Sequence, residues 1–424
     1  MADRRLSRMR RLAAVAALCL GAALALVGGL AASAPASADA APGPTLTASA
    51  AIVIEASTGQ SLYGVGAQRR LPVASTTKLM TALLTLEQAR LGSVFAAPDY
   101  HPAPSESQIG LVPGERMSVH DLLLALLLPS ANDAAEDLAF NLGHGSVGRF
   151  VEMMNARARE LGLVHTHYTT PIGLDTPGNY SSASDLVKLA VFLLERQAYF
   201  AHVVALPRAI LRTGAHPRVL TNRNDLIGRV GWVNGVKTGH TLAAGYVMVG
   251  SGARGGMTLV SAVLGTPSQS ARDADTLALL GYGFAHFHLA TPVRAGTVLA
   301  RPTVRDQPGV HPQVLAGRTF TTVVSRSTKL STRVVVSPQL TGPLPPHAVV
   351  GHVLVLANGR PIATIPLLLA ARLAAVSPLT LVGRFLTRPS TLVVLVALVA
   401  AAIALALLRR ERARARDSVR PQAA

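Results

Sequence analysis

The 424-residue sequence predicts an α+β protein: an antiparallel sheet flanked by helices, then a small all-β domain, then a C-terminal transmembrane helix. Three observations carry this prediction. Residues 46–287 mix short strand-like segments with longer segments of helical period. Residues 290–370 lose the helical period and show short alternating segments punctuated by Gly and Pro. Residues 391–408 form an uncharged apolar run that is long enough to span a bilayer as a helix.

Within residues 46–287 the predicted strands lie at the two ends and the helices between them. A hairpin over 50–65 turns at Ser57-Thr58-Gly59, and two strands near the end of the region pair with each other. Residues 118–142 form a helix that Pro129 breaks, because proline lacks the N–H that a helix interior needs. The other helices are expected over 75–90, 151–163, 182–197 and 270–287.

The two ends of the chain predict export and anchoring. Residues 1–38 combine five arginines, an apolar stretch and an A-x-A site at Ala36-Ser37-Ala38, as in a secretory signal; an uncleaved anchor is the alternative. We expect a juxtamembrane linker over 371–390 and a basic cytoplasmic tail over 409–424, because positive charge beside a span favours the cytoplasmic side. The chain between leader and span is then extracytoplasmic, anchored in the cytoplasmic membrane.

Composition limits the classes of partner. Cys19, the only cysteine, lies in the predicted leader, so a processed chain would have neither a disulfide nor thiol catalysis. The formal net charge is +18, yet aromatic residues are only 4% and no nucleic-acid-binding module is recognisable. We therefore predict no nucleic-acid partner. A high-arginine background and attraction to an anionic polymer or surface both account for the charge.

Residues 72–87, PVASTTKLMTALLTLE, place a serine three residues before a lysine at the start of an apolar run. Residues three apart share one face of a helix, so a neutral Lys78 could remove the Ser75 proton, and the helix start could stabilise an oxyanion. The alternative is a helix-capping serine followed by a surface lysine. Only four of the 40 basic residues are lysines. Lysine, unlike arginine, can lose its proton when it is desolvated.

Two later motifs favour the catalytic interpretation. PSAND supplies Ser130 and Asn132 at the break after an apolar helix, where side chains can project into a cleft. GVKTGHT supplies Lys237, Thr238 and Gly239 just before a strand whose edge could pair with an extended peptide. The ammonium and hydroxyl can bind a carboxylate, and the glycine lets a ligand approach the backbone. A second ammonium beside the first lysine would also lower the pKa of that lysine.

The ordered motifs S-x-x-K, S-x-N and K-T-G resemble those of the penicillin-recognising serine enzymes. The surrounding sequence resembles one branch, the low-molecular-weight penicillin-binding proteins that act as D-alanyl-D-alanine carboxypeptidases, from about Ala50 to Phe287 and more weakly through the β domain. The resemblance implies a β-lactamase/transpeptidase-like catalytic domain over 46–287. It also implies peptidoglycan stem peptides as substrates, acylation by β-lactams, and neither a cofactor nor a metal.

The resemblance also implies a role for each motif residue. Ser75 would be the nucleophile and Lys78 its general base, Ser130 would carry a proton to the leaving group or help position Lys78, and Asn132 would hold the substrate amide. The implied substrate-binding residues are Lys237 and Thr238 at the terminal carboxylate, the adjacent Gly239, His240 (whose N–H would form an oxyanion hole with that of Ser75), and Arg272 at the start of the last helix. Ala131 stands where glycine is more usual.

Several other features have simpler interpretations. GHGSVG at 143–148 matches a dinucleotide fingerprint but follows a helix rather than a strand, so a loop is predicted. His165 and His167 could face one way on a strand, but no carboxylate-bearing metal motif joins them. Asp175 in GLDTPG matches a loop of the resembled family and is expected to form a turn that shapes the region near the site.

Two alternative functions remain at this point. A class A-like β-lactamase would need a glutamate that activates the deacylating water, with an asparagine four residues later. Between the S-x-N and K-T-G motifs the glutamates are Glu136, Glu152, Glu160 and Glu195, and none has asparagine at that spacing. A non-catalytic cell-wall binding or sensor protein of the same fold is the other alternative, and the intact motifs argue against it.

Overall fold

The structure is a computed structural model and describes residues 42–417. The predicted signal peptide at 1–38, with Cys19, and the last seven residues of the predicted basic tail lie outside the described residues. The α+β prediction is confirmed. A mixed region of helices and strands is followed by an all-β region and then by two C-terminal helices.

The centre of the mixed region is a five-stranded antiparallel sheet. Its strands are β1 (Ala50–Glu55), β2 (Ser61–Val65), β7 (Val233–Thr241), β8 (Gly245–Arg254) and β9 (Met257–Thr266). Their order in the sheet is β2-β1-β9-β8-β7. The predicted hairpin is β1–β2, and the predicted pair of strands is β8–β9. The K-T-G motif, expected just before a strand, lies inside β7, which is an edge strand of this sheet.

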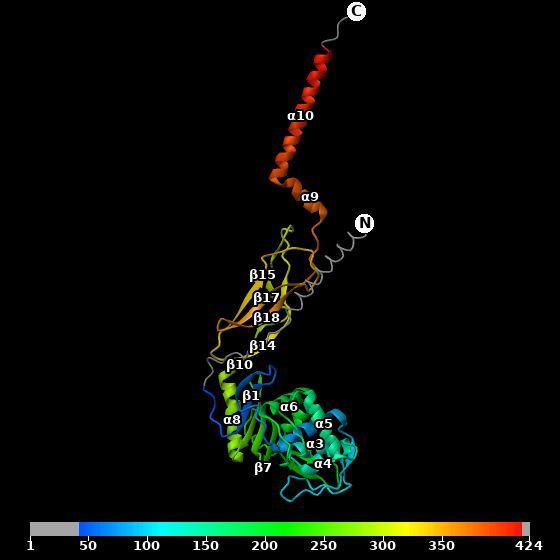
Figure 1. Cartoon of the computed structure of the whole chain (residues 1–424), viewed down its shortest axis with the longest axis vertical. Coiled ribbons are helices and arrows are strands. Elements are labelled where there is room, and N and C mark those ends of the chain that lie inside the picture. Colours follow the sequence, from blue (N-terminus) through cyan, green and yellow to red (C-terminus); the bar gives the residue numbers. More distant parts are fainter. Residues whose placement is uncertain (1–41, 418–424) are drawn as a thin grey trace, which may run out of the picture. The chain divides into compact units, whose positions relative to one another are not determined.

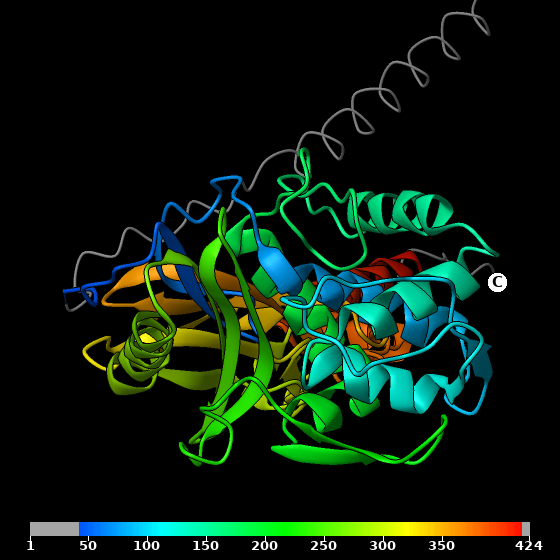
Figure 2. The same cartoon turned by 90° about the horizontal axis from the view of Figure 1, so that it is seen from below.

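Alternate side chains of a strand point to opposite faces of the sheet. Both faces of this sheet are apolar and packed against helices. Val53 packs with Leu279 of helix α8 (Gln269–His286) on one face, and Ile52 lies in the core cluster that includes α6 (Ala183–Arg196) on the other. Figure 2 shows α8 on one side of the strands and most other helices on the opposite side. The sheet is therefore a buried platform, and β7, itself mostly buried, is one of its two edge strands.

A group of helices covers the face of the sheet opposite α8 (Figure 1). They are the 3-10 turn η1 (Ala74–Thr77) and the helices α2 (Lys78–Gln88), α3 (Val119–Leu127), α4 (Asn132–Leu142), α5 (Val147–Glu160), α6 and α7 (Ala198–Val204). The predicted break at Pro129 is confirmed, since α3 ends before it and α4 begins after it. GHGSVG at 143–148 forms the turn from α4 into α5 and contributes the first residues of α5.

The sequence did not predict α7 or two short hairpins. These hairpins are β3 (Val94–Ala96) with β4 (Arg116–Ser118), and β5 (Arg208–Leu211) with β6 (Arg218–Thr221). Strands of three or four residues are too short to show an alternating pattern. The long connection between β3 and β4, residues 97–115, is important below because it reaches the site.

Between residues 287 and 377 the regular secondary structure consists of strands. They are β10 (Phe287–Val293), β11 (Val298–Ala300), β12 (Thr303–Val304), β13 (Val314–Ala316), β14 (Phe320–Ser325), β15 (Leu330–Val336), β16 (Gln339–Leu340), β17 (Val349–Ala357) and β18 (Arg360–Leu369). Five form a sheet in the order β11-β13-β18-β17-β15. Val353, Val355, Ile365 and Leu367 form part of its own hydrophobic core.

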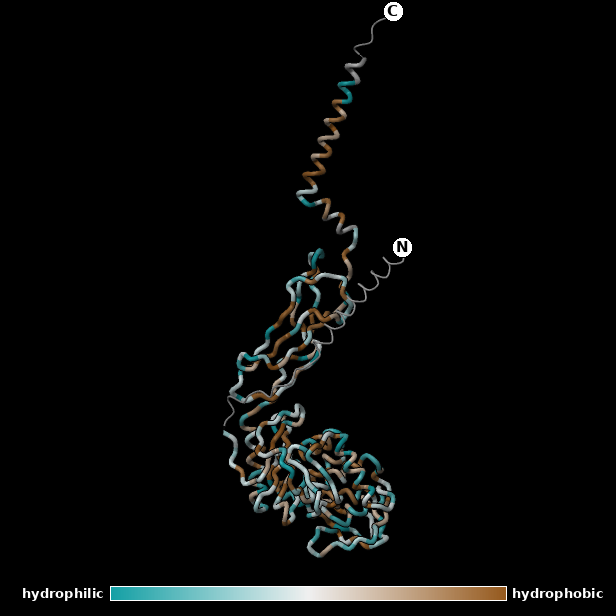
Figure 3. Tube along the Cα trace, in the orientation of Figure 1, coloured by the Kyte–Doolittle hydropathy of each residue, from teal (hydrophilic) through white to brown (hydrophobic). Residues whose placement is uncertain are grey.

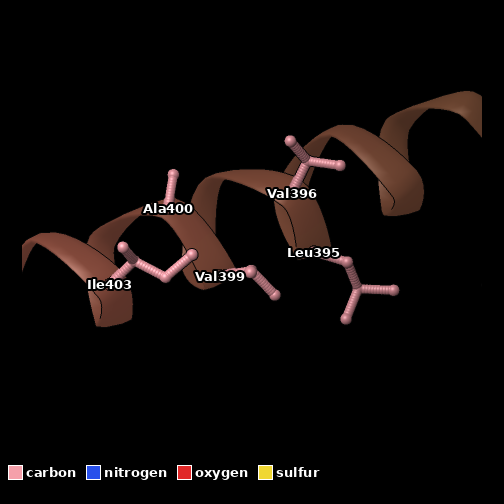
Figure 4. Close-up of a pocket in the computed structure, with 5 residues that line it drawn as sticks. All are labelled: Leu395, Val396, Val399, Ala400 and Ile403. Atoms are coloured by element: carbon pink, nitrogen blue, oxygen red, sulfur yellow. The ribbon is translucent and has the colours of Figure 1, made fainter.

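The chain ends in α9 (Pro378–Thr387) and α10 (Pro389–Asp417). Within α10, Pro389–Arg412 has the length and the mean hydropathy, 3.0, of a helix that can cross a membrane. Figure 3 shows this stretch as mostly hydrophobic, and Figure 4 shows five of its apolar side chains, from Leu395 to Ile403. None of this window is buried by the rest of the described chain. The helix continues into the basic residues that follow.

Candidate active site

Ser75 lies in η1, immediately before α2. The residues at the cap positions of these two elements are Val73 and Thr77, so Ser75 does not cap a helix. Ala74 has a φ of 45°, in the left-handed region that costs a non-glycine residue free energy. The turn buries Ala74, Thr76 and Thr77 and leaves Ser75 partly exposed. It therefore presents the Ser75 side chain while hiding its neighbours.

Lys78 is fully buried and makes three close contacts. Its Nζ lies 3.1 Å from Ser75 Oγ. It also lies 2.6 Å from Asn132 Oδ1 and 2.7 Å from the Ile172 carbonyl oxygen. The amide and carbonyl oxygens can only accept, so they use both N–H groups of a neutral amine and leave its lone pair facing the Ser75 hydroxyl. Burial lowers the pKa of Lys78 to about 7, partly opposed by Glu106. The arrangement can therefore remove the serine proton.

Lys237 reaches Ser130 from strand β7. Its Nζ donates to Ser130 Oγ at 2.8 Å and to the Thr238 carbonyl at 2.8 Å. Ser130 lies at the break between α3 and α4 and has a φ of 68°. Its side chain accepts the hydrogen bond from Lys237 in this left-handed backbone conformation. Burial holds the pKa of Lys237 well below its usual value, and the charge of Lys78 adds to this effect. The low pKa of Lys78, by contrast, comes mainly from burial rather than from the second ammonium that the sequence suggested.

Asn132 is the first residue of α4 and connects Lys78 to a residue that no motif predicted. Its Oδ1 accepts from Lys78, and its Nδ2 donates to Glu106 Oε2 at 2.7 Å. Glu106 comes from the β3–β4 connection. Five of the predicted residues thus form two hydrogen-bonded groups: Ser75, Lys78 and Asn132 in one, and Ser130 and Lys237 in the other.

Gly239 packs directly against the turn that carries Ser75. An ideal β-carbon at Gly239 would lie 2.8 Å from the Ser75 backbone nitrogen and 3.0 Å from Ala74 Cβ. The glycine is therefore required by the protein's own packing, beyond the ligand approach that the sequence suggested. The next residue, His240, is exposed, and its ring lies 4.0 Å from that of Tyr246, between ring centroids. Thr238 is buried on the same strand.

Two arginines act on the site through their charge. Arg272 is buried at the start of α8, donates to Asp273 Oδ1 at 2.7 and 2.9 Å, and lies 3.5 Å from Asp225. Its charge helps to lower the pKa of Lys237. Arg223, which the sequence did not indicate, is exposed and lowers the pKa of both Lys78 and Lys237. An isolated arginine in a loop carries no motif that would have predicted this.

The segment 170–175 holds the nucleophile turn from another side. Besides the Ile172 carbonyl, it contributes Gly173, where an ideal β-carbon would approach the Ala74 carbonyl oxygen to 2.1 Å at a φ of 84°. Asp175 accepts from Thr241 Oγ1 at 2.6 Å and from the Ala243 N–H at 3.0 Å. It therefore joins this segment to the β7–β8 turn, which agrees with the predicted shaping role.

His165 and His167, which no metal motif joins in the sequence, make other contacts. His165 donates its backbone N–H to Asp185, and His167 Nδ1 contacts the Gly178 carbonyl. Among residues 42–417 no group of three or more His, Cys, Asp or Glu side chains is arranged to hold a metal ion.

Comparisons with known proteins agree on one family. The family model described as D-alanyl-D-alanine carboxypeptidase, peptidase S11, matches residues 36–268. The chain is 33% identical to the D-alanyl-D-alanine carboxypeptidase DacF of Bacillus subtilis, over 61% of this chain and 67% of the relative. It is 31% identical to DacC of Escherichia coli, over 77% of this chain and 84% of the relative.

Solved structures give the same result. Penicillin-binding protein 5 of Haemophilus influenzae has a TM-score of 0.66 at 27% identity, covering 78% of this chain and 99% of that one. The Streptomyces K15 DD-transpeptidase has a TM-score of 0.55 at 33% identity, covering 58% and 100%. The first match covers more of the chain than the mixed region contains. The second covers a number of residues close to that of the mixed region.

Proposed function

The chain belongs to the D-alanyl-D-alanine carboxypeptidase family and is a serine-type peptidase of the cell wall, and we propose that its acyl-enzyme forms on Ser75. Its substrates are peptidoglycan stem peptides, from which it removes the terminal D-alanine, and β-lactams acylate it. The observation that carries the assignment of Ser75 is the position of Lys78 Nζ, 3.1 Å from Ser75 Oγ and bound by two acceptors. These two acceptors leave a lone pair for the serine proton.

The proposed reaction has two steps. In the first, Lys78 takes the Ser75 proton while Oγ attacks the carbonyl between the two terminal D-alanines. The C–N bond then breaks, and the proton passes from Lys78 through Ser130 to the amine of the departing D-alanine. In the second step, water attacks the ester, Lys78 takes a proton from the water, and Ser75 leaves with a proton returned by Lys78. Each step begins and ends with a neutral lysine.

The remaining predicted residues would bind the substrate. The backbone N–H groups of Ser75 and His240 would stabilise the tetrahedral oxyanion. Lys237 and Thr238, beside Gly239, would bind the terminal carboxylate, whose charge would favour the ammonium form of Lys237. Asn132 would donate its second N–H to a substrate carbonyl. Arg272 would act at longer range, since its guanidinium is bound by Asp273.

We also propose that α10 anchors the enzyme in the cytoplasmic membrane. The apolar window Pro389–Arg412 supports this, as does the basic sequence after it, which favours the cytoplasmic side. The catalytic region would then face the cell wall. A reporter fused after the last residue should be protected from external protease in intact cells, whereas cleavage there would contradict this orientation.

Labelling with a fluorescent penicillin tests the nucleophile. The full chain in detergent should form a stable covalent adduct and release D-alanine from a pentapeptide. Ser75→Ala should do neither, and Ser331→Ala, at an exposed serine of β15, should do both. Absence of any adduct with the wild type would refute the proposal. An adduct that is lost rapidly by turnover would favour a β-lactamase.

A further inference from the structure

The β3–β4 connection is fastened to the first turn of α4 by side-chain and backbone contacts. Glu106 accepts from Asn132 Nδ2 at 2.7 Å, and the Asn132 backbone N–H donates to the Ser107 carbonyl at 2.6 Å. The Asp133 carboxylate accepts the backbone N–H groups of residues 109, 110 and 111 at distances from 2.9 to 3.2 Å. Glu106 is therefore held beside Asn132 by the residues that follow it.

The carboxylate of Glu106 determines which way the Asn132 amide points. An ionised carboxylate accepts hydrogen bonds and cannot donate them, so it selects the Nδ2 end of the amide. The Oδ1 end must then face Lys78 Nζ, at 2.6 Å. One N–H of Nδ2 is used by Glu106, and the second remains for a ligand. With the amide reversed, two donors would face each other at Lys78 and two acceptors at Glu106.

Glu106 is itself held in place from the other side. Its Oε2 accepts from the Tyr100 hydroxyl at 2.7 Å, and its Oε1 accepts from the Ala103 N–H at 2.9 Å. Burial alone would raise the pKa of Glu106. The hydrogen bonds from Asn132, Ala103 and Tyr100 outweigh burial and hold the pKa below its usual value. The side chain is therefore a fixed anion at neutral pH.

We propose that Glu106 is a positioning residue of the reaction proposed above: acting through Asn132, it holds Lys78 against Ser75, and its negative charge sets the pH range in which Lys78 serves as base. This inference rests on the proposed role of Lys78. It adds a residue outside the three motifs and assigns a function to the β3–β4 connection.

The other charges around Lys78 act on it differently. Burial lowers the pKa of Lys78, and Glu106 opposes this more than any other charge; Glu136 and Asp133 of α4 oppose it less, and Arg223 adds to the lowering. Burial holds the pKa of Lys237 on β7 well below the usual value, and the charge of Lys78 lowers it further. Burial also raises the pKa of Glu136 to about 7, so it is only partly ionised at neutral pH. Unlike Glu136, Glu106 therefore carries its full negative charge beside Lys78 at neutral pH.

Glu106→Gln separates charge from contact, because glutamine can still accept from Asn132 Nδ2 but carries no charge. Without that charge the pKa of Lys78 falls, so the lysine stays neutral at lower pH. The acid limb of kcat/KM for D-alanine release should move to lower pH by about one unit, the order expected for an opposite charge within 4 to 6 Å. The control Glu195→Gln removes an exposed carboxylate of α6 and should leave the limb in place.

Two further variants separate positioning from charge. Tyr100→Phe removes one hydrogen bond to Glu106 and keeps the carboxylate, so kcat should fall a few-fold with an unmoved acid limb. Glu106→Ala removes both contact and charge, so the limb should move and the plateau of kcat should fall roughly ten-fold or more, as for a misplaced catalytic group. Thermal unfolding of each variant would detect a general loss of folding.

The outcomes are distinct. An acid limb that is unchanged in Glu106→Gln would overturn the inference, whatever happens to the plateau rate. A wild type that releases no D-alanine in the same assay would refute the proposed function instead. A shifted limb in Glu106→Gln together with an unshifted limb in Tyr100→Phe and Glu195→Gln would support the assignment of Glu106.

Discussion

Gly239 and Ser75 are packed so closely that a β-carbon at position 239 would lie 2.8 Å from the Ser75 backbone nitrogen. Edge strand β7 and the turn η1 therefore approach each other closely, with the Ser75 backbone and the Ala74 methyl group facing Gly239. The Ser75 N–H that would stabilise an oxyanion is at this contact. The distance between strand and turn consequently determines where that N–H points.

Gly239→Ala should reduce the rate of acylation by a labelled penicillin roughly hundred-fold, because a small displacement of reacting groups is enough for such a loss. The added methyl would push the turn away from β7. Gly231→Ala is the matched control, since no atom of the described chain lies within 4 Å of an added β-carbon there. An acylation rate in Gly239→Ala within two-fold of the wild type would contradict the proposed role of this contact.

Lys78→Arg should lower D-alanine release by a factor of about 10² to 10⁴, the usual contribution of a general base. Arginine keeps the positive charge but stays protonated, so it cannot accept the Ser75 proton. Lys188→Arg on α6 should have normal activity, since Lys188 is exposed and donates to the Gly162 carbonyl. Full activity in Lys78→Arg would exclude Lys78 as the base.

The acylation rate of the wild type should fall as the pH drops below about 7, the value to which burial lowers the pKa of Lys78. The neutral amine is the reactive form, and below the pKa its fraction falls about ten-fold per pH unit. Stopped-flow acylation between pH 5 and 9, with a β-lactam that does not titrate in this range, measures the effect. A flat profile would show that proton removal by Lys78 does not limit acylation.

Asp137→Asn should stabilise the protein at pH 8 but much less at pH 5. Burial raises the pKa of Asp137 to about 7, and its Oδ2 has no hydrogen-bond partner among residues 42–417. An unfolded aspartate loses its proton near pH 4. The folded state therefore binds the extra proton between about pH 4 and 7, and wild-type stability falls as the pH rises through that window.

Chemical denaturation at both pH values measures this effect. The gain at pH 8 should be roughly 2 kcal/mol larger than at pH 5, after allowing for imperfect burial. Asn141 Nδ2, which donates to Asp137 Oδ1, can donate equally to the new amide oxygen. Asp99→Asn, at an exposed aspartate, should show no such difference. Equal effects of Asp137→Asn at the two pH values would argue that Asp137 ionises normally.

The sequence indicates the motif residues of this site far better than the residues that hold them in position. Ser75 and Lys78 could be paired because residues three apart share a helical face, and Ser130 and Asn132 because a proline marks the helix break before them. Glu106 belongs to a long connection without periodicity, 26 residues before Asn132. No spacing rule relates two such residues, so only the folded structure brings them together.

The same distinction applies to the fold. Strands β8 and β9 were predictable because ten residues show a clear pattern, whereas β3 to β6 have only three or four residues each. The K-T-G motif was expected just before a strand, yet it lies within β7. There the missing side chain is what allows the strand to approach η1.

One of the three contacts that hold Lys78 comes from the main chain, at the Ile172 carbonyl. A mutational scan should therefore find position 172 tolerant of many apolar residues, because each supplies the same oxygen. Position 173 should be intolerant, because any side chain there collides with Ala74. Selection by β-lactams could not delete the 172 contact by replacing a side chain. A change in that contact would require an insertion, a deletion or a displaced backbone.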